Sequence, residues 1–174
     1  MLGRITLNPL AHIDWIGTVL FPLIALVAHV PLLGWAKPVP VNFRNLKAPR
    51  RDFALVALAG PVSNLVLAAL ATPIFLILYG DEAIEMAPML AASFVVLNVS
   101  LAVFNMIPFP PLDGGNVLSG FVPEPVAGAI DRLRPYGFII LYALMLSGML
   151  SRFVFPVARA ITTALRIPLW AWLV

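Results

Sequence analysis

No cysteine occurs anywhere in the 174 residues, which excludes disulfide bonds and thiolate-bound metal sites. Charged residues are also scarce, at 11% of the chain, whereas soluble domains carry about 25%. The chain is 61% hydrophobic, with a mean hydropathy of +1.00. So few charges cannot cover a water-facing surface, and we therefore expect an integral membrane protein. Histidine occurs only twice, at His12 and His29.

Long apolar runs are the main feature that is present. A spanning helix needs about 20 predominantly apolar residues, and the runs near residues 15–34, 53–79, 86–107 and 136–156 are of that order. We therefore predict an all-α, polytopic membrane bundle of about four spans, with residues 1–174 forming a single membrane-embedded domain. The last C-terminal residues are apolar but too few to span, and we expect a re-entrant or interfacial segment there.

The charged residues predict the orientation. Five basic residues crowd one loop, which is typical of a cytoplasmic loop rather than of a nucleic-acid-binding patch. Alternation across the membrane then puts Asp113 near the cytoplasmic side. We thus expect a protein of the cell membrane with lipid around it and no nucleic-acid partner. The basic residues of the loop are Lys37, Arg44, Lys47, Arg50 and Arg51.

The most informative stretch is NMIPFPPLDGG, residues 105–115, which closes the third apolar run. Its three prolines cannot continue a regular helix, and irregular backbone at membrane depth is tolerated only inside protein or beside a wet cavity. We therefore expect Asp113 to line a cavity, and Gly114 and Gly115 to permit a close approach to the backbone. A carboxylate at that depth is a functional-site candidate, although Pro, Asp and Gly also form ordinary interfacial turns.

The residues alone leave the role of Asp113 open between metal binding, proton relay and pairing with a buried base. A catalytic zinc site uses three protein ligands, and the spacing of His12 and His29 matches no helical ligand pair. A proton-coupled carrier that uses Asp113 is an alternative hypothesis, but the sequence contains no internal repeat that would support it.

Three asparagines lie within the apolar runs. Asn64 follows small residues at helical spacing, which favours a helix-packing face, with a cavity-facing amide as the alternative. Asn98 and Asn105 lie two turns apart on one helix face. They are expected to bind either neighbouring helices or the backbone of an extended peptide in a groove.

Four blocks occur in order along the chain: GRITLNPLAHID at 3–14, GWAKPVPVN at 34–42, AGPVSN at 59–64 and NMIPFPPLDGG at 105–115. With these blocks the chain resembles the site-2 proteases, the intramembrane zinc metallopeptidases, and most closely their compact bacterial branch without a PDZ domain. The resemblance implies a protease of the bacterial inner membrane whose substrates are membrane proteins or transmembrane peptides.

The resemblance also implies a zinc cofactor, with Asp113 of the Leu-Asp-Gly motif as one metal ligand. Asn105, Pro108 and Pro111 are then expected to position substrate backbone near the metal. In the family, the other two ligands and the general base come from an H-E-x-x-H helix. That motif is absent from all 174 residues.

The missing motif allows two interpretations. Either the chain is an N-terminally truncated copy whose H-E-x-x-H helix lies before Met1, or it is a shortened, non-catalytic protein that binds transmembrane segments. Truncation is favoured, because the other blocks are intact and the chain opens inside a motif. In both cases we expect residues 1–174 alone neither to hold zinc nor to cleave a peptide bond.

Overall fold

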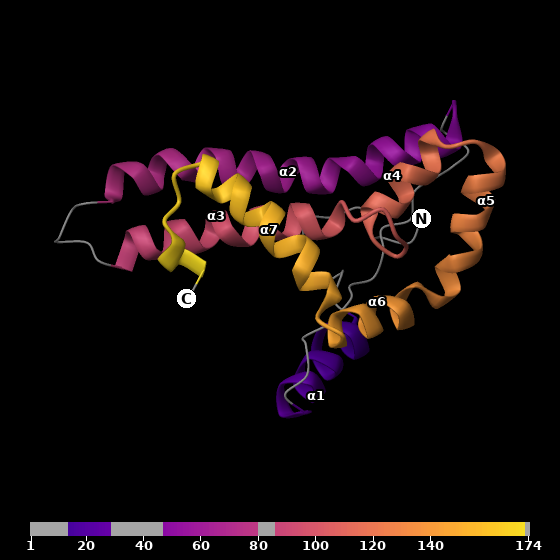
Figure 1. The fold of residues 1–174 in the computed structure, drawn as a ribbon, viewed down its shortest axis with the longest axis horizontal. Helices are drawn as coiled ribbons and strands as arrows, with labels where there is room; N and C mark the ends of the chain where they lie inside the picture. Colours follow the sequence, from indigo (N-terminus) through magenta and orange to yellow (C-terminus); the bar gives the residue numbers. More distant parts are fainter. Residues whose placement is uncertain (1–13, 29–46, 80–85, 173–174) are drawn as a thin grey trace.

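The computed structural model describes residues 14–28, 47–79 and 86–172. All regular structure within these residues is helical, which confirms the all-α prediction (Figure 1). In chain order the elements are the π-helical η2 (Trp15–Leu20), α1 (Phe21–Ala28), α2 (Pro49–Leu78), α3 (Met86–Asn105), α4 (Asp113–Phe121), α5 (Glu124–Leu133), the 3-10 turn η4 (Arg134–Tyr136), α6 (Gly137–Leu146), α7 (Met149–Ala164) and the 3-10 turn η5 (Leu169–Trp172).

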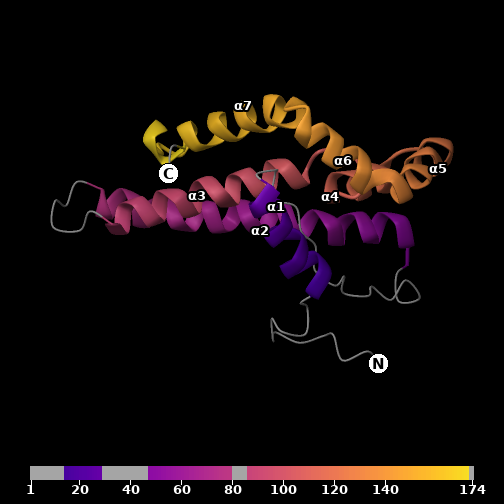
Figure 2. The same ribbon diagram turned by 90° about the horizontal axis from the view of Figure 1, so that it is seen from below.

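Two antiparallel helices, α2 and α3, form the long axis of the molecule (Figures 1 and 2). Both are long and apolar enough to cross a membrane, with mean hydropathies of 2.1 and 2.0 over their most apolar windows. The 30 residues of α2 extend about 45 Å at 1.5 Å per residue. These two helices coincide with the apolar runs near residues 53–79 and 86–107 that the sequence predicted as spans.

The start of α2 follows from its first residues. Pro49 occupies the first turn, where its missing N–H leaves no helical bond unmade. The Asp52 carboxylate accepts the backbone N–H of Ala48 at 3.0 Å. Pro61 and Pro73 lie inside α2, and the helix continues through both.

The core between α2, α3 and α7 consists mostly of small side chains. Phe75, Val95 and Val99 are its largest fully buried apolar side chains. Small residues let helix backbones approach closely, which matters in lipid because no hydrophobic driving force holds helices together there. The buried alanines of this core are Ala68, Ala71, Ala92, Ala158 and Ala171.

The run predicted as a fourth span, residues 136–156, is not one straight helix. It breaks at Ser147–Gly148, and the helical segments on either side are bent by 78°. Gly148 has a φ of 68°, a conformation that glycine adopts without steric cost. The Ser147 hydroxyl donates to the carbonyl of Leu144 at 2.9 Å and accepts the N–H of Met149 at 3.3 Å. The polar groups at the break are thereby satisfied locally.

The prediction of about four spans is therefore not confirmed. The described residues contain two helices that could cross a membrane, or three if the bent pair counts as one span. Of the first predicted run, 15–34, only residues 15–28 lie within the described part, as η2 and α1.

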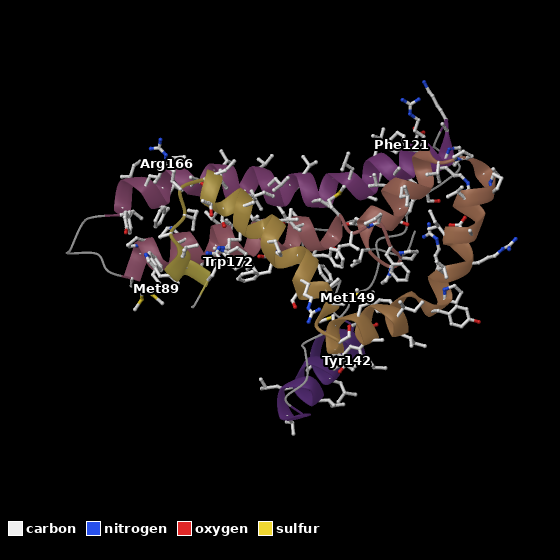
Figure 3. The ribbon with its side chains drawn as sticks, viewed as in Figure 1. Met89, Phe121, Tyr142, Met149, Arg166 and Trp172 are labelled. Atoms are coloured by element: carbon white, nitrogen blue, oxygen red, sulfur yellow. The ribbon has the colours of Figure 1, made fainter. Side chains whose placement is uncertain are left out.

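The C-terminal segment folds back onto the bundle after α7 (Figure 2). Arg166 has a φ of 60°, and the next N–H, that of Ile167, donates to the Thr162 carbonyl at 2.9 Å. This bond is typical of a helix that ends in a left-handed residue. The Trp172 indole then donates to the hydroxyl of the same Thr162 at 3.2 Å, which fixes η5 beside α7 (Figure 3).

The contact between α4 and α2 predicts a difference between two glycine substitutions. A Cβ at Gly120 would collide with the Ala54 Cβ and lie 3.0 Å from the Arg50 carbonyl oxygen, whereas a Cβ at Gly128 would meet nothing within 4 Å. We expect Gly120→Ala to lower the free energy of unfolding by about 1–3 kcal/mol through overpacking. Gly128→Ala, inside α5, should raise it by about 0.5–1 kcal/mol. Unfolding in detergent measures both, and equal stabilities would contradict the contact.

The left-handed conformation of Arg166 predicts a stabilising substitution. Arg166→Gly removes the clash between Cβ and backbone, so we expect a gain of about 0.5–1 kcal/mol in the free energy of unfolding. The matched control is Arg159→Gly inside α7, which should lose about 1 kcal/mol. Thermal unfolding of the two variants tests this, and a loss of stability in Arg166→Gly would argue against the fold-back.

Candidate metal centre

Residues 106–112 form an irregular turn between α3 and α4 (Figure 1). The three prolines have no N–H, and the bond between Pro110 and Pro111 is cis. The N–H groups of Phe109 and Leu112 bond inside the turn, and that of Ile107 bonds to the last turn of α3. Ile107 donates to Phe104 at 3.2 Å, Phe109 to Ile107 at 2.7 Å and Leu112 to Phe109 at 3.0 Å. The prediction that the proline series ends the helix is confirmed, because α3 stops at Asn105.

Glycines allow the helices on either side to pack directly against the backbone of this turn. A Cβ on Gly114 would collide with the carbonyl oxygens of Met106 and Ile107, and one on Gly115 would lie 2.7 Å from the Phe109 carbonyl carbon. On the other side, a Cβ on Gly137 of α6 would lie 2.8 Å from the Pro110 carbonyl oxygen. The close approach expected at Gly114 and Gly115 therefore exists, and the group that approaches is the backbone of the turn itself.

Asp113 is the first residue of α4 and lies over α2. Its Oδ2 would be 3.2 Å from a Cβ built on Gly60, and the Asp113 side chain is partly buried. Asp113 lies outside both candidate spans, and burial raises the pKa of its carboxyl above the ordinary value of 3.8. Among the described residues no basic side chain forms an ion pair with it. A bound cation would offset that cost of burial.

The described residues do not make a zinc site by themselves. Zinc needs three protein ligands for a catalytic site, and no group of three His, Cys, Asp or Glu side chains that could hold a metal occurs within residues 14–28, 47–79 and 86–172. His12, His29 and the blocks at 3–14 and 34–42 lie outside the described residues. Among the described residues, Asp113 is therefore a single candidate ligand.

The residues expected to position substrate lie on the same stretch as Asp113. Asn105 is the last residue of α3 and is partly buried; Pro108 is exposed, and Pro111 is partly buried. The structure thus brings these three residues and Asp113 to one irregular segment and the helix ends that flank it. Their contact with substrate stays a prediction.

The two other asparagines differ in their surroundings. Asn98 is only 5% exposed within the α2–α3 pair, and its amide nitrogen donates to the Phe94 carbonyl at 2.9 Å. This local bond favours packing rather than a cavity role for Asn98. Asn64 is partly buried on α2, one turn beyond Gly60, and both roles stay open for it.

The sequence reasoning missed two features of this region. One is the contact of Gly60 with Asp113, 53 positions away, which no local pattern in the sequence indicates. The second feature is an apolar cavity of about 390 Å³ between α2, α3 and α7, which reaches the start of the turn at Met106 and Ile107. The bend at Gly148 creates it by laying α7 beside α3, and that bend was not predicted.

Comparison with known proteins gives consistent relatives. Residues 73–148 match Peptidase family M50. The chain is 38% identical over 170 residues to "Putative zinc metalloprotease YwhC" of Bacillus subtilis, covering 91% of this chain and 72% of that protein. It is 29% identical over 154 residues to "Putative zinc metalloprotease Rip2" of Mycolicibacterium smegmatis, covering 88% and 58% respectively. No solved structure matches.

These matches include the candidate site. The M50 region contains α3, the irregular turn and Asp113. The similarity to the Bacillus protein extends over nearly the whole chain and most of its relative. The chain therefore belongs to peptidase family M50, the site-2 protease family of membrane zinc metalloproteases.

Proposed function

We propose that this chain supplies the aspartate-bearing part of an intramembrane zinc protease that cleaves a peptide bond in membrane-spanning substrates. The observation that carries the proposal is Asp113, whose partly buried carboxylate lies over Gly60 of α2 without a basic partner among the described residues. Partial burial disfavours the charged form of a carboxylate, and a bound cation would offset that cost. Membership of the M50 family supports zinc as that cation.

We further propose that the remaining ligands come from polypeptide outside residues 1–174. The family's H-E-x-x-H motif does not occur in this sequence. Asp113 alone cannot complete a three-ligand site. The part of the site that this chain would contribute is one carboxylate together with the segment that binds the substrate backbone.

The irregular turn is suited to bind an extended peptide, whose N–H groups would donate to carbonyl oxygens of the turn. Three of residues 107–112 are prolines without an N–H, and the other three N–H groups donate to carbonyls of the turn or of the last turn of α3. The turn therefore presents carbonyl acceptors, such as that of the exposed Pro108, and no spare N–H between Ile107 and Leu112. A helical substrate has its N–H groups bonded internally, so it must unwind before it can donate to the turn. The Asn105 amide, at the end of α3, is proposed to compete for the same backbone groups.

The proposed location is the bacterial inner membrane, with Asp113 nearer the cytoplasm. Gly60 lies 11 residues beyond Pro49, or about 17 Å along α2 from its basic end. The proposal that this end is cytoplasmic is supported by Lys47, Arg50 and Arg51, because basic residues are enriched on the cytoplasmic side of membrane proteins.

Reading the DNA in frame upstream of Met1 tests the source of the missing ligands. An encoded H-E-x-x-H segment is the expected result. We then expect the longer protein to bind one zinc ion and to cleave a transmembrane peptide, and Asp113→Asn to lower its zinc affinity by more than about tenfold. Zinc content by mass spectrometry and peptide cleavage are the two measurements.

The control is Asp52→Asn, which keeps an oxygen acceptor for the Ala48 N–H and lies away from Asp113 in the sequence. Its zinc affinity and turnover should equal those of the unmodified protein. Zinc-dependent cleavage by residues 1–174 alone would overturn the proposal. So would undiminished zinc binding in Asp113→Asn.

A further inference from the structure

Helix α4 touches α2 at both of its ends. At its C-terminal end, Gly120 lies against Ala54 and the carbonyl of Arg50; at its N-terminal end, Asp113 lies over Gly60. The two helices are therefore antiparallel along this contact. Asp113 and Gly120 are about 10.5 Å apart along α4, and Ala54 and Gly60 are about 9 Å apart along α2. Because these spacings nearly match, the position of Gly120 on α2 determines where Asp113 lies.

The small residues of this contact do not by themselves prevent sliding. Gly120 has no side chain to interlock with α2, and Ala54 offers only a methyl group. Asp113 forms no ion pair with α2 within the described residues. A polar side chain that reaches from α2 to α4 would therefore add a restraint on the axial position of α4.

Arg50, one turn before Ala54, supplies such a restraint. Its Nη1 lies 3.5 Å from the Ser119 hydroxyl oxygen of α4, and its Nη2 donates to Glu124 at 2.9 Å and to Asp131 at 3.3 Å. Asp131 also accepts from Nε of Arg134 at 2.8 Å. One guanidinium on α2 thus holds the end of α4 and both ends of α5.

The charges of this cluster identify it as a clamp rather than an anion site. Its two guanidinium groups face two carboxylates, so no positive charge is left over for an external anion. Arg50 is 43% exposed and Glu124 is 77% exposed, and single pairs of that kind are individually weak. The restraint comes from geometry: the rigid fork of one arginine binds three acceptors, which a lysine ammonium on a flexible stem cannot reproduce.

We propose that Arg50 is a positioning residue for Asp113, because it fixes the register of α4 on α2 and so keeps the Asp113 carboxylate over Gly60. The functional meaning of this role rests on the proposed metal ligation by Asp113. The register itself does not, and it can be measured without metal.

The absence of native cysteine allows a direct measurement of the register. Val66 on α2 and Phe121 on α4 are both exposed, so Val66→Cys and Phe121→Cys can carry spin labels (Figure 3 shows Phe121). Double electron–electron resonance in lipid then measures the distance between the two labels. We expect Arg50→Gln to shift the mean distance by about 1.5 Å or more, the rise of one helical residue, or to split the distribution. Arg51→Gln, at the next position and equally cationic, should leave the distribution unchanged.

Two further measurements separate positioning from general stability. Arg50→Lys should give a distance distribution between those of Arg50→Gln and the unmodified protein, since lysine keeps the positive charge but lacks the planar guanidinium group. Amide exchange of residues 114–121 should accelerate in Arg50→Gln while that of α3 stays unchanged. A lower unfolding temperature with an unchanged distance would overturn the proposal, and so would equal shifts in Arg50→Gln and Arg51→Gln. A failure of zinc binding in the Asp113 test would leave this result unaffected, so the two proposals fail separately.

Discussion

Close approach of one backbone to another is the constraint on which this structure depends. In lipid an unpaired N–H or C=O has no water to bond, and helices gain nothing from the exclusion of apolar side chains from lipid. The N–H groups of Ile107, Phe109 and Leu112 accordingly bond within the turn or to α3, and the turn packs closely against the backbone around it. The glycines at 114, 115 and 137 permit that packing, and the turn leads directly into Asp113 at the start of α4.

The sequence predicted the parts of the fold that depend on local composition. Two apolar runs became α2 and α3, and the proline series ended α3 at Asn105. The break at Ser147–Gly148 was missed, because a glycine and a serine in an evenly apolar run are also compatible with an unbroken membrane helix. What decides the outcome is the left-handed φ of Gly148 and the bonds of the Ser147 hydroxyl, which composition does not record.

The candidate site was predictable in its chemistry but not in its geometry. Asp113 stood out as a carboxylate among prolines and glycines, and the family resemblance supplied its expected role. Its contact with Gly60 and the restraint by Arg50 join residues 53 and 69 or more positions apart, and no local periodicity encodes such pairs. The Leu-Asp-Gly motif therefore identified the candidate metal ligand, whereas the side chains proposed to hold it in place became visible only in three dimensions.

The glycine contacts around the turn define a fingerprint for recognising similar chains. Collisions with backbone exclude any side chain at 114, 115 and 137, and Gly120 faces the Ala54 methyl, so these positions should tolerate no larger residue. Glycines 114, 115, 120 and 137 lie one, two, seven and twenty-four residues after Asp113. A divergent sequence that keeps this spacing can preserve the turn even where the surrounding prolines have changed, and a screen of substitutions at the four positions would map the tolerance of the site without any assay of proteolysis.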